Sequence, residues 1–129
     1  MTAELFWTIF PLWIRAFALT LAVEVPLFVL IGRLWTQGDE RVSIKRLALA
    51  GAAGTCVTHP LLWFAWPLVI SDYDTYILTG ELIVATVESF TFFALARRVR
   101  LSRAVAASFL ANAASYGGGL ALRALGLME

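Results

Sequence analysis

The chain has 129 residues, of which 60% are hydrophobic and 15% are charged. A soluble domain of this length would be about half apolar and about a quarter charged, so the surplus apolar surface is expected to face lipid. The formal net charge of +1 leaves no extended basic face, which excludes nucleic acid as an expected partner.

Four apolar segments are long enough to cross the hydrocarbon core of a bilayer, which takes about 20 helical residues. The sequence therefore predicts an all-α integral membrane protein, a four-helix bundle that forms a single membrane domain over residues 1–129. Residues 1–13 are also apolar, but Pro11 and two tryptophans there favour an interfacial segment. The predicted helices cover about residues 14–34, 47–70, 76–96 and 104–125.

The cations predict an orientation in the membrane. Seven of the ten Lys and Arg residues lie in two loops, at about residues 36–46 and 97–103, and an eighth, Arg33, ends the first predicted helix just before the first loop. The turn between the second and third segments carries Asp72 and Asp74 instead. By the positive-inside rule, both basic loops are expected in the cytoplasm and both termini outside the plasma (inner) membrane. The first loop also holds a run of turn-forming residues, Gln37, Gly38 and Asp39.

Two apolar stretches share an unusual pattern, LAVEVPLFVLIGR in the first segment and ATVESFTFFALAR in the third. In each, a glutamate (Glu24, Glu88) is followed four residues later by Phe28 or Phe92, and nine residues later by an arginine. A carboxylate at bilayer depth costs at least about 2.5 kcal/mol. Two of them at matching positions therefore indicate a polar centre inside the bundle.

The second and fourth segments can be aligned in the same way, starting from the arginines Arg46 and Arg103. Combined with the two glutamate stretches, this alignment predicts a duplicated helical hairpin, a parallel repeat about an axis along the membrane normal. The polar residues superimpose as Thr55 on Asn112, Thr58 on Ser115 and His59 on Tyr116.

Depth places these polar residues in one layer. Glu24 and Glu88 each lie nine residues from an arginine at the cytoplasmic edge, a rise of about 13 Å along a helix. Thr55 and Asn112 are nine residues from Arg46 and Arg103 and reach the same level. We expect an ion, proton or substrate site made by Glu24, His59, Glu88, Asn112 and Thr55, supported by Glu81, Thr58, Ser115 and Tyr116.

Three functions fit such a layer, and the first expectation is a cation- or proton-coupled transporter. A divalent metal ion could be held by Glu24, His59 and Glu88, whose carboxylates and imidazole are suitable ligands. We expect a homodimer in a lipid bilayer, because four short helices leave little room for both a shell and a pathway.

The second function is an intramembrane metal-dependent hydrolase acting on lipid or a membrane peptide. A glutamate would be the general base and Asn112 an oxyanion donor. The third is a non-catalytic membrane subunit or scaffold, in which the acids only lock the helices together. Interhelical hydrogen bonds in membranes contribute only about 0.6 kcal/mol on average, which is less than the free energy that burying two acids in the bilayer costs.

The layout resembles two known families. In size, helix number and the glutamate of AVEVP in its first segment, the chain is similar to the small multidrug-resistance transporters, although these have no second acid matching Glu88. The Glu, His and Asn set is similar to that of the CAAX-protease-like membrane peptidases, whose paired glutamates and two spaced histidines are absent from this chain. Neither resemblance covers a continuous motif, so no residue role is transferred from it.

Overall fold

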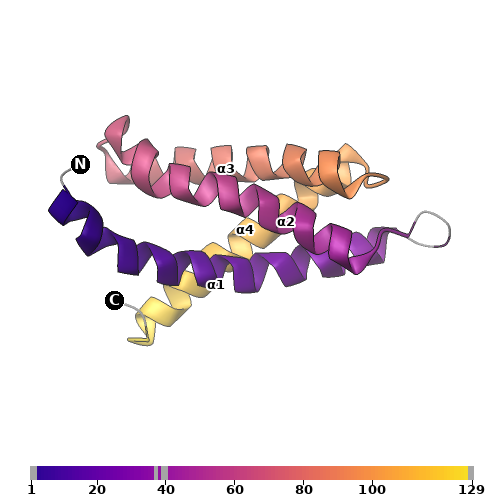
Figure 1. The fold of residues 1–129 in the computed structure, drawn as a ribbon, viewed down its shortest axis with the longest axis horizontal. Helices are drawn as coiled ribbons and strands as arrows, with labels where there is room; N and C mark the ends of the chain where they lie inside the picture. The colour runs from indigo at the N-terminus through magenta and orange to yellow at the C-terminus, as the bar shows by residue number, and fades with distance from the viewer. Residues whose placement is uncertain (1–2, 37, 39–40, 128–129) are drawn as a thin grey trace.

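The computed structural model describes residues 3–36, 38 and 41–127, and within these residues the chain is helical, with no strand (Figure 1). In this part of the chain, four helices are long and apolar enough to span a membrane. The second of them, Ile44–Leu68, combines an α-helix with a short π-helix and a 3-10 turn. The elements are α1 (Ala3–Trp35), α2 (Ile44–Pro60), η2 (Leu61–Ala65), η3 (Trp66–Leu68), α3 (Tyr73–Ala96) and α4 (Leu101–Ala124).

The first helix is longer than the sequence predicts. It begins at Ala3 rather than near residue 14 and continues through both Pro11 and Pro26. A proline inside a helix removes one backbone hydrogen bond, but no glycine or capping residue follows Pro11 to end the helix. The segment expected at the interface is therefore the first turns of α1, and its location at the interface stays a prediction.

Local capping explains where α2 and α3 begin and where α3 ends. The Ser43 side chain accepts a hydrogen bond from the backbone N–H of Arg46 (3.3 Å), and the Asp72 side chain accepts one from the backbone N–H of Thr75 (2.9 Å). These bonds give partners to N–H groups in the first turns of α2 and α3 that have none within the helix. The left-handed backbone of Arg97, with φ of 47°, stops α3. Of the predicted turn residues before α2, Gln37 and Asp39 lie outside the described residues.

The four helices form a closed ring in which α1 and α3 each pack against both α2 and α4. The chain runs up and down, so both termini and the α2–α3 turn lie at one end of the bundle, which we call the termini end (Figure 1). The α1–α2 and α3–α4 connections lie at the other end, the basic end, which also carries Arg46 and Arg103.

The apolar core occupies the half of the bundle nearer the basic end. It is built on Phe28, Phe92 and Leu47, with buried alanines from α2 and α4 between them. Close packing of α2 depends on Gly51 and Gly54: a Cβ on Gly51 would lie 2.8 Å from the ring of Phe28. The outer surface is apolar too, as in a protein that faces lipid, with exposed residues that include Leu30, Leu49, Leu78, Phe90 and Leu110.

The helix geometry changes directly after the predicted site residue His59. Pro60 has no N–H group to donate to the carbonyl oxygen four residues earlier. The following turns widen into η2, where the backbone N–H of Trp66 donates to the carbonyl of Leu61, five residues back. Wide turns of this kind are often found at functional sites, and this one adjoins the polar layer described next.

Candidate functional site

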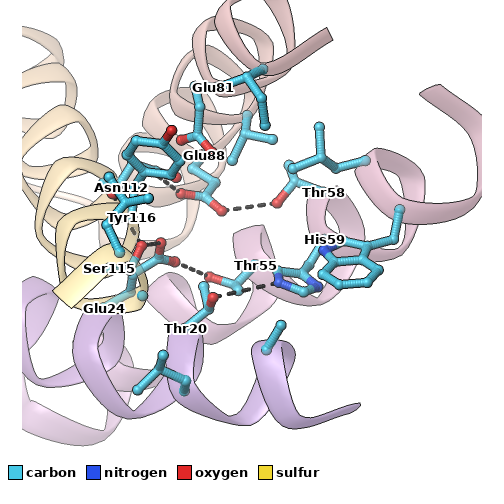
Figure 2. A pocket seen from close by; sticks show the side chains of 18 of the residues that line it. Thr20, Glu24, Thr55, Thr58, His59, Glu81, Glu88, Asn112, Ser115 and Tyr116 are labelled. Atoms are coloured by element: carbon cyan, nitrogen blue, oxygen red, sulfur yellow. Dashed lines mark hydrogen bonds between the residues drawn. The ribbon is translucent and has the colours of Figure 1, made fainter. Parts of the chain in front are cut away.

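Glu24 of α1 is held by donors from two other helices (Figure 2). The Thr55 hydroxyl of α2 donates to Oε2 at 2.8 Å, and the Ser115 hydroxyl of α4 donates to Oε1 at 2.7 Å. The side chain is 1% exposed. Each carboxylate oxygen of Glu24 therefore has one partner, and both partners come from predicted site residues.

Glu88 of α3 has a matching environment and is also 1% exposed. The Thr58 hydroxyl donates to Oε1 at 2.9 Å, and the Asn112 side-chain amide donates to Oε2 at 2.6 Å. The same amide nitrogen donates to the backbone carbonyl of Ser108 at 2.9 Å. Ser108, in turn, donates through its hydroxyl to the carbonyl of Ala85 on α3 at 2.8 Å, which fixes the orientation of α4 at this level.

The four bonds to the acids keep their pattern when the hairpin α1–α2 is interchanged with the hairpin α3–α4. In each hairpin, one donor bonds the acid of its own hairpin. The donor three residues farther along bonds the acid of the other hairpin. The corresponding pairs are Thr55–Glu24 with Asn112–Glu88, and Thr58–Glu88 with Ser115–Glu24.

The hydroxyl donors have a second acceptor within reach. Thr58 Oγ1 lies 3.1 Å from the carbonyl of Gly54, and Ser115 Oγ lies 3.1 Å from the carbonyl of Asn112. A hydroxyl has one proton to donate and lone pairs to accept. Each can therefore donate to an ionised carboxylate, or turn its proton to the backbone and accept from a protonated carboxyl, without movement of heavy atoms.

The acids lie at the floor of a cavity of about 360 Å³ that extends towards the termini end. Its walls include Thr20, His59, Glu81 and Tyr116 (Figure 2). Within the described part of the chain, the predicted supporting residues Glu81 and Tyr116 form no hydrogen bond with Glu24 or Glu88. They contribute to the wall of the cavity above the acid pair rather than to the network.

His59 is separated from the acid network in its bonding. Its Nε2 lies 3.4 Å from the Thr20 hydroxyl, and Nδ1 is buried without a hydrogen-bond partner among the described residues. Such an unmet polar atom costs about 1–3 kcal/mol. Aromatic rings surround the imidazole, with Phe17 and Trp63 at centroid distances of 5.3 and 6.0 Å.

The predicted metal site is not assembled in this arrangement. In residues 3–36, 38 and 41–127, no three His, Cys, Asp or Glu side chains come together in a group that could hold a metal ion. Glu24 and Glu88 are instead bonded to hydroxyl and amide donors, and His59 contacts Thr20 and aromatic rings. In the described residues, the acid pair and His59 therefore have separate sets of partners.

Two features of the site are absent from the predicted set of site and supporting residues. Ser108 is fully buried and orients Asn112. The sequence contains a signal for this role, because Ser108 is a polar residue four positions before Asn112 on the same helix. The aromatic enclosure of His59 has a weaker signal. Trp63 follows His59 by four residues, but Phe17 comes from another helix, and periodicity does not reveal such a contact.

Comparison of the chain with protein-family models, curated proteins and solved structures finds no match in any of the three. A functional assignment therefore depends on the chemistry of the site. The relevant features are two fully buried acids, four donors from α2 and α4, and a cavity that leads from the acids to the termini end.

Proposed function

We propose that the protein is a small membrane transporter in which Glu24 and Glu88 bind protons in exchange for a cation. The observation that carries this proposal is the position of the two acids, fully buried yet lining the floor of a cavity. Intramembrane acids of this kind are rare and are typically found on ion and proton pathways. The cavity supplies the access that a purely structural acid does not need.

Proton binding is supported by the hydrogen-bond partners. Asn112 presents an amide donor to Oε2 of Glu88, so a proton on this carboxyl belongs on Oε1, facing the Thr58 hydroxyl. Thr58 can accept that proton's hydrogen bond and donate to the carbonyl of Gly54 at 3.1 Å. Glu88 can thus gain or lose a proton while every partner remains bonded.

Coupling follows from the cost of burying charge. An isolated carboxylate inside a protein is unfavourable unless it is protonated or paired with a cation. Glu24 and Glu88 have hydroxyl and amide partners but no cationic side chain bonded to them in the described residues. A cation that enters the cavity would therefore displace protons from the pair, and its departure would restore them.

The membrane topology proposed from the sequence fits this mechanism. Four candidate spans and an apolar exterior support insertion, and the positive-inside rule puts the basic end in the cytoplasm. The cavity then opens towards the outside. The interchangeable bonding pattern around Glu24 and Glu88 supports a duplicated hairpin with a pseudo-two-fold axis between the acids.

The hydrolase alternative has less support. It requires a metal-bound water or a nucleophile with an adjacent base. The one cysteine, Cys56, is exposed, and His59 lies among aromatic rings rather than beside an acid. A hydroxyl does adjoin a carboxylate, since Ser115 donates to Glu24 at 2.7 Å, so we favour transport on the cavity and the paired acids rather than on the lack of a nucleophile.

Proton flux into proteoliposomes tests the proposal. Vesicles containing the full chain and a pH-sensitive dye are exposed to gradients of sodium, potassium and organic ammonium ions. Wild-type protein should change the internal pH with at least one cation, and Glu24→Gln and Glu88→Gln should abolish the response. Glu4→Gln, which alters an exposed acid in the first turn of α1, is the matched control. Equal fluxes in all four proteins would reject the proposal.

A further inference from the structure

The cavity is larger than proton exchange requires. Its volume is about 360 Å³, whereas one water occupies about 30 Å³ of liquid. Pockets for small organic ligands begin at about 300 Å³. A proton or a bare inorganic ion would need only the acids and their immediate donors. The extra space therefore indicates an organic solute.

The lining of the cavity divides into a charged floor and a largely apolar wall. Glu24 and Glu88 form the floor, Glu81 adds a third acid on the wall, and the exposed Arg123 of the last turn of α4 adds one cation, so acids outnumber it three to one in the lining. Around and above them are large apolar and aromatic residues, including Trp63 and Tyr116. Carboxylates select a cation, and aromatic faces attract both a cation and an apolar body. The lining therefore fits a cationic group at the floor and an apolar body above it.

The cavity is also unsealed along one side. The first buried residue of α3 is Gly80, and the last buried residue of α4 is Ser115. Beyond these points, the turns of both helices nearest the termini end still line the cavity, through Ile77 and Leu120 for example. Figure 1 shows the final turns of α4 diverging from the first turns of α3. A solute could reach the acids between these helices, from the apolar surroundings.

We propose that the solute is an amphiphilic organic ammonium ion, with its charge at Glu24 and Glu88 and its apolar body between α3 and α4. This inference rests on the proposed function, because it names the cation that exchanges with protons. Its distinguishing claim is that the apolar body occupies the cavity beside Gly119.

Binding of matched probes tests this claim in lipid nanodiscs containing the full chain, with empty nanodiscs to subtract partitioning into lipid. The probes are naphthylmethylammonium, the neutral naphthylmethanol and the small cation methylammonium, titrated by calorimetry. We expect saturable binding of naphthylmethylammonium, with the other two weaker by about tenfold or more. Glu88→Gln should weaken the binding of naphthylmethylammonium by a similar factor, and Glu4→Gln should leave it unchanged.

Two glycines of α4 provide a matched pair for the apolar body. Cβ atoms on Gly117 and Gly119 would meet nothing within 4 Å, so a side chain meets no contact at its first atom in either position, but only Gly119 of the two lines the cavity. Gly119→Phe should weaken the binding of naphthylmethylammonium by about tenfold and leave the binding of methylammonium unchanged. Gly117→Phe should change neither.

The inference would be overturned if methylammonium or the neutral naphthylmethanol bound as tightly as naphthylmethylammonium. It would also be overturned if the two glycine variants had equal effects on binding. If such a result accompanies proton flux that still requires Glu24 and Glu88, the transporter proposal stands and only the solute class fails. If the flux is absent as well, both proposals fail.

Discussion

The rings of Phe28 and Phe92 lie against each other, with centroids 4.6 Å apart and planes tilted by 36°. Each phenylalanine follows its glutamate by four residues, so the ring pair lies one helical turn nearer the basic end than the acids. Phe28 is 0% and Phe92 1% exposed. The pair, with Leu47 beside it in the core, separates the acid cavity from the basic end.

Removal of one ring should open a path for water through this barrier. Phe92→Ala is expected to raise the passive proton leak of proteoliposomes under an imposed potassium diffusion potential. The free energy of unfolding should also fall by about 3–5 kcal/mol, because a buried aromatic ring is lost. Phe90→Ala, at a 57% exposed position of the same helix, is the control. A leak equal to that of the control in a folded Phe92→Ala protein would contradict the assignment of the ring pair as a barrier.

The Thr55 hydroxyl should matter because of Glu24. Thr55→Val preserves the shape of the side chain but leaves Oε2 of Glu24 without its partner. The expected loss is about 1–3 kcal/mol in the free energy of unfolding in mixed micelles. Thr91→Val is the matched control, since the Thr91 hydroxyl is exposed and donates to its own helix at 2.9 Å. Equal losses in the two variants would show that the bond to Glu24 contributes nothing specific.

Close contact of α2 with α3 should depend on Gly54. A Cβ at this position would lie 2.9 Å from Cγ and 3.3 Å from Cα of Glu88. Gly54→Ala is therefore expected to push the helices apart and to destabilise the protein by about 1–3 kcal/mol. The same change at Gly118, where a Cβ meets nothing within 4 Å, should stabilise α4 by about 1 kcal/mol through helix propensity. A stabilised Gly54→Ala protein would be incompatible with this packing.

The start of α3 should respond to pH through Asp72. Hydrogen bonds from the side chain and the backbone N–H of Thr75 hold the pKa of Asp72 below its usual value. A carboxyl whose pKa is lower in the folded state stabilises that state above its unfolded pKa, and the contribution disappears as the pH falls through the folded pKa. Asp72→Asn should therefore lower the free energy of unfolding at neutral pH. In acid, the free energies of unfolding of the variant and of wild type should become more similar. A difference that is independent of pH would contradict the capping role.

Hydropathy and spacing were sufficient to predict four candidate membrane spans and the interior positions of Glu24, Glu88 and their donors, but not the position of Tyr116, which is 42% exposed. Glu24, Glu88 and their donors recur at helical spacing, and side chains three and four residues apart share one face. The structure buries this face in all four helices. Helix ends were harder to place. The continuation of α1 through Pro11 depends on a helix that tolerates one missing hydrogen bond, which composition does not reveal.

The partners within the site could not be derived from one-dimensional spacing. Periodicity places Ser115 on the inner face of α4, but whether it bonds Glu24 or Glu88 depends on how the helices cross. The enclosure of His59 by Phe17 similarly requires the contact between α1 and α2. Such tertiary choices are set by the small residues that control how closely helices approach.

The most direct test of the central claim is the infrared difference spectrum of the carboxyl groups, recorded as the pH of the reconstituted protein is changed. If both buried acids exchange protons with the cavity, Glu24→Gln and Glu88→Gln will each remove a distinct protonated-carboxyl band that wild type and Glu4→Gln retain. Addition of a transported cation should diminish the same bands. Bands that are unchanged in both glutamine variants would contradict proton exchange at these residues and leave the acids with a structural role.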